Sequence, residues 1–208
     1  MPLIKGGPPV RDIEAASSAR DSNHEISDLT SADSAVRWRA ARALGGNPVA
    51  VAPLAEALSK EGTPLVREAI LTALMRVGDE NSIEVLLPYL RSQDAGMRNA
   101  AIETLQALPD AVIPFMTSLL TDKDSDVKLL ATELARNMPA DRATKLLTGL
   151  LDRESHPNVC AAAIEVLAEL GTMEALPSLR SCVDRFAGTP FLPFAASQAI
   201  ARISEGQG

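Results

Sequence analysis

Aromatic residues are nearly missing from this sequence: Phe, Trp and Tyr together make up 3% of it, although 46% of its residues are hydrophobic. The core must therefore be built from Ala, Leu, Val and Ile. Such a core suits closely packed helices better than a β-sandwich, which relies on aromatic and β-branched side chains. The composition favours an all-α fold.

The sequence also lacks basic stretches and long apolar runs. Its net charge is −7 without a polybasic segment, which disfavours the electrostatic footprint of a nucleic-acid-binding protein. No apolar run approaches the roughly 18 residues of a membrane-spanning helix, and the start MPLIKGGPPV lacks the apolar stretch of a signal peptide. We expect a cytoplasmic protein that binds neither nucleic acid nor membrane.

Groups that carry catalysis are few. The chain has two histidines and two cysteines and no phosphate-cradling glycine loop. His156 and Cys160 lie four residues apart on one expected helix, but two ligands are fewer than a zinc site requires. Cys160 and Cys182 lie in apolar helical context, as small buried hydrophobic residues do. We expect no catalytic residue, no metal and no cofactor, and hence no enzymatic activity.

An internal repeat organises the rest of the chain. Six segments such as VREAILTAL share an apolar stripe with helical spacing, and successive copies begin 30, 31, 30, 32 and 33 residues apart. The first residues of the copies are Val36, Val66, Met97, Val127, Val159 and Leu192. Three positions earlier stand residues that we expect at helix N-caps, namely Asp33, Thr63, Asp94, Asp124, His156 and Thr189.

A second apolar segment precedes each copy, so that the repeating unit is a helical hairpin. One hairpin cannot bury its own apolar face, and neighbouring hairpins must stack. We therefore predict a right-handed α-solenoid of about six hairpins over residues 23–205, after a flexible N-terminal tail over 1–22. Phe186, Phe191 and Phe194 cluster in the last repeat and are expected to close its core.

The turn that carries Asp, followed by Val-Arg or Val-Lys, resembles the HEAT repeat family. The period is similar to that of compact bacterial HEAT-like repeats, including the phycobilisome lyase type. Asp and Arg four residues apart on one helix are expected to pair and to form a structural ladder along the solenoid. The expected ladder residues are Asp33, Arg37, Arg67, Asp94, Arg98, Asp124 and Lys128.

The second helices of a solenoid line its inner face, which is the expected binding groove. Residues that point away from the core stripe form an aromatic and basic end followed by an acidic ridge. The candidates are Trp38, Arg39, Arg42, Glu68, Glu103, Glu133 and Glu165. Trp38, the single tryptophan, either faces this groove beside arginine, as an interaction hot spot does, or covers the open end of the first repeat.

These patterns predict a non-enzymatic scaffold or adaptor that holds another protein or peptide in the inner groove, in bacterial signalling or assembly. The resemblance to lyase-type repeats implies an alternative, a bilin-lyase-like protein that handles a chromophore. A third possibility, DNA-lesion recognition on a HEAT-like scaffold, is disfavoured by the net charge of −7.

Overall fold

The computed structural model describes residues 22–189 and 191–206, and these residues form helices, turns and short loops without a β-strand. The predicted tail at 1–22 lies outside the described residues except for Ser22. The chain divides into two compact units between Val85 and Leu86. We call them unit 1 and unit 2 and describe each by itself.

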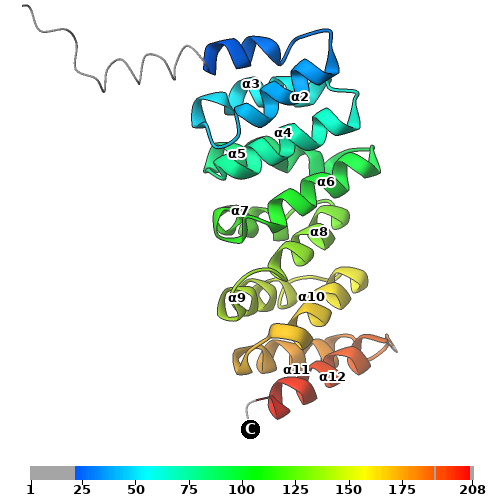
Figure 1. Cartoon of the computed structure of the whole chain (residues 1–208). Coiled ribbons are helices and arrows are strands. Elements are labelled where there is room, and N and C mark those ends of the chain that lie inside the picture. Colours follow the sequence, from blue (N-terminus) through cyan, green and yellow to red (C-terminus); the bar gives the residue numbers. More distant parts are fainter. Residues whose placement is uncertain (1–21, 190, 207–208) are drawn as a thin grey trace, which may run out of the picture. The chain divides into compact units, whose positions relative to one another are not determined.

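Unit 1 contains two helical hairpins. The first joins the helical residues 22–28 to α2 (Ser34–Ala43). The second follows the 3-10 turn η1 (Pro48–Ala50) and joins α3 (Val51–Lys60) to α4 (Pro64–Val77), and α5 (Glu80–Leu86) runs to the boundary. α2 packs beside α4, and α3 packs against α4 (Figure 1). The predicted stripe of α4 is buried, with Val66 at 1% exposure and Ile70 and Leu74 at 0%.

Unit 2 continues the same pattern. Its elements are η2 (Leu87–Arg91), α6 (Ala95–Gln106), α7 (Pro109–Leu120), α8 (Ser125–Ala135), α9 (Ala140–Leu151), α10 (Pro157–Leu170), η3 (Met173–Ala175), α11 (Leu176–Arg185) and α12 (Phe191–Glu205). The second helices α6, α8, α10 and α12 pack in sequence, and the first helices α7, α9 and α11 do the same (Figure 1). Each unit is thus a stack of hairpins, and the prediction of an all-α solenoid is confirmed.

The expected cap positions begin the second helices. Asp33, Asp94 and Asp124 each accept a hydrogen bond from the backbone N–H two residues later. Thr63 and His156 occupy the same position without a side-chain cap bond. The sequence pattern therefore located these helix starts, because capping depends on residues that are close along the chain.

The prediction for the last repeat is wrong in one respect. Phe191 and Phe194 are 63% and 64% exposed, and Phe186 is only half-buried. Small and aliphatic side chains, Leu192, Ala196, Ala199 and Ile203, form the buried stripe of α12 instead. The helical period places the two phenylalanines off this stripe, so hydrophobic character alone did not put them in the core.

Candidate functional site

A polar position that the sequence analysis missed recurs in the turn before the second helix. The residue two positions before each cap accepts a hydrogen bond from the backbone N–H of the cap residue, at 2.8 to 3.2 Å. The five acceptors are Ser31, Glu61, Ser92, Asp122 and Glu154. A hydroxyl or carboxyl group at this position in five successive repeats was the signal that could have revealed it.

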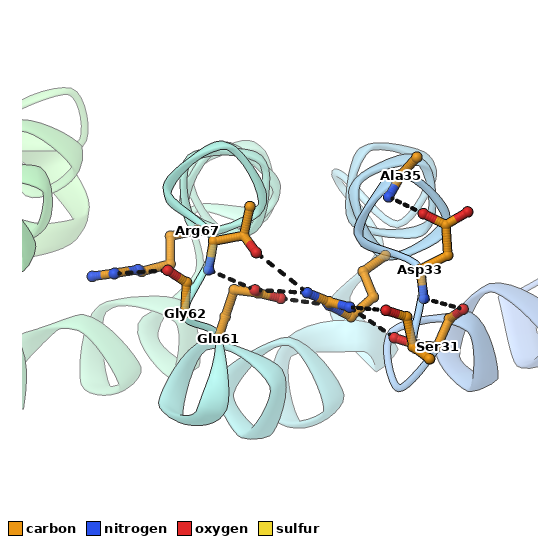
Figure 2. A network of polar contacts seen from close by, with 9 residues as sticks. Ser31, Asp33, Ala35, Glu61, Gly62 and Arg67 are labelled. Carbon is orange, nitrogen blue, oxygen red and sulfur yellow. Dashed lines mark hydrogen bonds and ion pairs between the residues drawn. The ribbon is translucent and has the colours of Figure 1, made fainter.

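In unit 1 two of these turns, the one before α2 and the one before α4, surround the guanidinium of Arg37. Its Nε and Nη2 donate to the two carboxylate oxygens of Glu61 at 2.7 and 2.9 Å. Its Nη1 donates to the main-chain oxygens of Ser31 and Ala32 at 2.8 and 3.2 Å, and Nη2 also lies 3.5 Å from Thr63 Oγ1. Figure 2 shows this network with Ser31 and Glu61 on opposite sides of the guanidinium. The five N–H groups of Arg37 therefore all have acceptors.

This ion pair is largely buried, unlike the exposed pair of Glu56 and Lys60 in the same unit. The side chain of Glu61 is 4% exposed and that of Arg37 is 19% exposed. The hydrogen bonds from Arg37 lower the pKa of Glu61 to about 2, with a further contribution from the Thr63 N–H and against the effect of burial. The same hydrogen bonds raise the pKa of Arg37.

The expected pairing within the helices requires correction. Asp33 accepts its hydrogen bond from Ala35 as a cap, while the guanidinium of Arg37 binds Glu61 of the following repeat. A short Asp side chain is held at the helix start by capping, and the longer Arg side chain reaches the next hairpin. The ladder thus connects neighbouring repeats.

Unit 2 repeats this arrangement. Lys128 forms an ion pair with Glu154, although Asp124 lies four residues before it on the same helix and caps it. Burial alone would raise the pKa of Glu154, but the hydrogen bond from Lys128 and backbone N–H groups lower it. The other ladder arginines bind main-chain oxygens: Arg98 donates to Ser92 at 2.7 Å and, in unit 1, Arg67 to Gly62 at 3.2 Å. Asp94 caps α6.

A pocket of about 870 Å³ lies beside the Arg37 network in unit 1. It opens between the first helical segment, α3 and the turn that follows α3. Its apolar side chains are those of Ile26, Leu29, Ala52, Pro53 and Ala57. The other lining residues are Gly62 and the polar residues Thr30, Ser31, Arg37, Glu56, Lys60, Glu61 and Thr63. We call this the α3 pocket.

Lys60 and Glu56 are the exposed charges of the α3 pocket. Their side chains are 71% and 70% exposed and form an ion pair of 2.6 Å between residues four apart on α3. Such exposed pairs stabilise a helix by only about 0.3–0.5 kcal/mol. The hydrogen bond to Lys60 lowers the pKa of Glu56.

Trp38 lies elsewhere in unit 1 and is half-buried. The guanidinium of Arg42 sits 4.6 Å from the centre of its ring, a cation–π contact. Trp38 also lines a shallow pocket of about 230 Å³ with Leu65 and Val66 of α4. Trp38 therefore lies at the surface next to the start of α4, and the adjacent Arg39 is exposed. We call Trp38, Arg39, Arg42 and Leu65 the tryptophan patch.

The other groove candidates fall in both units. Glu68 is exposed on α4 in unit 1, while Glu103, Glu133 and Glu165 lie on α6, α8 and α10 of unit 2. Arg136 binds Glu133, Glu165 and also Glu169, so the predicted acidic ridge contains a cation at its centre. That these residues and the tryptophan patch line one groove stays a prediction.

The two cysteines are neighbours, which the sequence did not reveal. Cys160 on α10 and Cys182 on α11 are both free and fully buried. The hydrogen bond between the two thiols raises the pKa of Cys160, and burial acts in the same direction. His156 is exposed at the helix start, four residues before Cys160. Over residues 22–189 and 191–206, no three metal-ligating side chains gather.

No helix within the described part of the chain has both the length and the apolar composition needed to cross a bilayer.

Comparison with known families assigns the repeat. The family model described as HEAT repeats matches residues 26–106 and 113–187. The chain therefore belongs to the HEAT repeat family, as the turn motif predicted.

Curated relatives carry a more specific name. The chain is 31% identical over 149 residues to the bilin biosynthesis protein PecE of Mastigocladus laminosus, a match that covers 69% of this chain and 55% of that protein. It is 40% identical over 75 residues to PecE of a Nostoc species, covering 35% of this chain and 30% of that protein. The chain thus spans about half or less of the length of these curated relatives.

The solved structures that are similar to this chain have low identity to it. A designed armadillo repeat protein in complex with the peptide (KR)4 has a TM-score of 0.45 at 18% identity, and the match covers 86% of this chain and 98% of that one. The complex of CpcE and CpcF of phycocyanin lyase from a Nostoc species has a TM-score of 0.39 at 17% identity, with 99% and 97% covered.

These comparisons correct one expectation. The scarcity of catalytic groups predicted a protein without enzymatic activity, and that prediction is wrong. The curated relatives are named for bilin biosynthesis. The expectation rested on the scarcity of histidine, cysteine and glycine-loop motifs, whereas the bilin-lyase-like alternative rested on the resemblance of the repeats.

Proposed function

We propose that this chain is a bilin-handling protein of the lyase type, which binds an open-chain tetrapyrrole and acts on it together with a protein partner. The observation that carries the proposal is the 31% identity over 149 residues to a bilin biosynthesis protein. A HEAT-like fold by itself hosts many functions, so the fold adds no argument for this one.

The chemistry of the chain is compatible with such a ligand. A bilin combines apolar pyrrole rings with propionate carboxylates and N–H donors. It needs an apolar cavity with a few polar groups placed at its edge. Unit 1 has a cavity of this kind in the α3 pocket, with its five apolar side chains and the exposed Lys60 and Glu56.

The direct test is a titration of the folded chain with phycocyanobilin, followed by visible absorbance and bilin fluorescence. We expect a saturable change in the absorbance spectrum and an increase in fluorescence, because a bound bilin is held in fewer conformations than a free one. Co-elution of bilin and protein in size-exclusion chromatography checks the complex. An unchanged spectrum with a chain that circular dichroism shows to be helical would contradict the proposal.

A second candidate function, docking of a partner protein, is favoured by the tryptophan patch. Leu65 is 60% exposed beside the half-buried Trp38, and Arg39 and Arg42 add positive charge. Partly exposed Trp and Arg are typical of interaction hot spots. The matching partner segment would present an apolar side chain next to carboxylates.

Capture of partners with the wild-type chain and a Trp38→Ala, Arg42→Glu double variant tests this candidate. The variant is expected to lose a partner that the wild type retains. Equal capture by a folded double variant would remove the patch from consideration, whatever the result of the bilin titration.

A further inference from the structure

We infer that the α3 pocket of unit 1 is the bilin site, with Lys60 as the ligand of a propionate group and Glu56 as the acceptor of a pyrrole N–H. This inference rests on the proposed function and assigns it to particular residues.

The volume and the lining of the pocket suit a ligand of this size. At about 870 Å³ the α3 pocket falls in the range of roughly 300–1,000 Å³ that is usual for small-molecule and cofactor sites. Ile26 and Leu29 come from the first helical segment, and Ala52, Pro53 and Ala57 come from α3. The small size of the three α3 residues leaves room for flat rings. The pocket beside Trp38, at about 230 Å³, lies below that range.

The two cationic side chains that line the pocket, Arg37 and Lys60, differ in whether they can bind a carboxylate of the ligand. Arg37 has acceptors for all five of its N–H groups, and its carboxylate partner Glu61 is 4% exposed. Arg37 therefore stabilises the end of the pocket and is not free to bind a ligand. Lys60 is exposed and, among the described residues, forms its ion pair with the equally exposed carboxylate of Glu56. Because that pair is weak, a carboxylate of the ligand can replace it at little cost.

When a bilin replaces the ion pair between Lys60 and Glu56, both side chains find a new partner on the ligand. When the propionate takes Lys60, the carboxylate of Glu56 becomes available one helical turn away on α3. A pyrrole N–H of the bilin can then donate to it. The pocket thus offers a cation, an anion and an apolar surface, which are the partners that the propionates, the N–H groups and the rings of a bilin require.

Two variants with matched controls test the site by phycocyanobilin titration. Ala57→Trp fills the pocket, and its control Ser118→Trp adds the same side chain at the equivalent, exposed position nine residues before Val127 on α7. Lys60→Glu reverses the cation, and its control Lys145→Glu reverses an exposed lysine on α9. We expect dissociation constants at least about tenfold higher for Ala57→Trp and about fivefold higher for Lys60→Glu. Both controls should match the wild type.

The outcomes separate the site from the function. If the wild-type chain produces no spectral change, the proposed function is overturned and this inference with it. If the wild type binds and all four variants bind equally well, the α3 pocket is overturned and the proposed function stands. Should Ala57→Trp lose its helical circular dichroism, Lys60→Glu decides alone, because its side chain is 71% exposed and its replacement leaves the core intact.

Discussion

Replacing Glu61 by Gln should show that the contact between neighbouring hairpins stabilises unit 1. The substitution keeps the shape of the side chain and removes the charge opposite Arg37. In the wild type the carboxylate of Glu61 is 4% exposed and binds the guanidinium through two hydrogen bonds of 2.7 and 2.9 Å. The variant leaves a largely buried cation without its counter-charge.

The pKa of Glu61 gives the size of the effect. Its shift from 4.5 to about 2 corresponds to about 3 kcal/mol in favour of the folded state. Since Gln still accepts one of the hydrogen bonds from Arg37, we expect Glu61→Gln to lower the free energy of unfolding by about 2–3 kcal/mol at pH 7. Because the folded-state pKa lies below the ordinary one, this stabilisation is complete above pH 4.5 and disappears as pH falls through about 2.

Trp38 provides the assay. It is the single tryptophan of the chain and lies in unit 1, so its fluorescence during urea unfolding reports on that unit. Unfolding is measured for wild type and variant at pH 7, 5, 4 and 3. The difference between them should fall to about half of its pH 7 value near pH 3.

Glu56→Gln is the control, because the side chain of Glu56 is 70% exposed and exposed ion pairs contribute little to stability. The reasoning would be refuted if Glu61→Gln were no more destabilising than Glu56→Gln, or if its effect were as large at pH 3 as at pH 7.

Three further predictions concern unit 2. Asp124→Ala removes the cap of α8 and should cost about 1 kcal/mol in urea unfolding followed by circular dichroism; an unchanged midpoint would contradict it. Gly171→Ala should lower the free energy of unfolding, because a Cβ there would lie 2.4 Å from a main-chain oxygen. Gly149→Ala on α9 has open space around the new Cβ and should raise the free energy of unfolding by about 0.5–1 kcal/mol. Urea unfolding of both variants checks the pair, and effects of equal sign would refute the comparison. Cys160 and Cys182 are fully buried, so a thiol reagent should label them only after unfolding, and rapid labelling of the native chain would contradict that burial.

Local sequence patterns were enough to predict the helical repeat. Helical spacing predicted the buried stripe of α4, and the cap positions Asp33, Asp94 and Asp124 predicted where α2, α6 and α8 begin. These features depend on residues within a few positions of one another. The prediction for Phe191 and Phe194 rested on their hydrophobic character, although the helical period counted from Leu192 already places both side chains off the buried stripe of α12.

The sequence by itself determined the all-α hairpin repeat, since hydrophobic period and capping act within a single turn or helix. Only the tertiary structure decided that Arg37 binds Glu61, 24 residues away, and that Lys128 binds Glu154, 26 residues away. It also decided which small side chains of α3 border a cavity and that the two cysteines meet. Every repeat offers several chemically equivalent partners for a long basic side chain, and the stacking of one hairpin on the next selects among them.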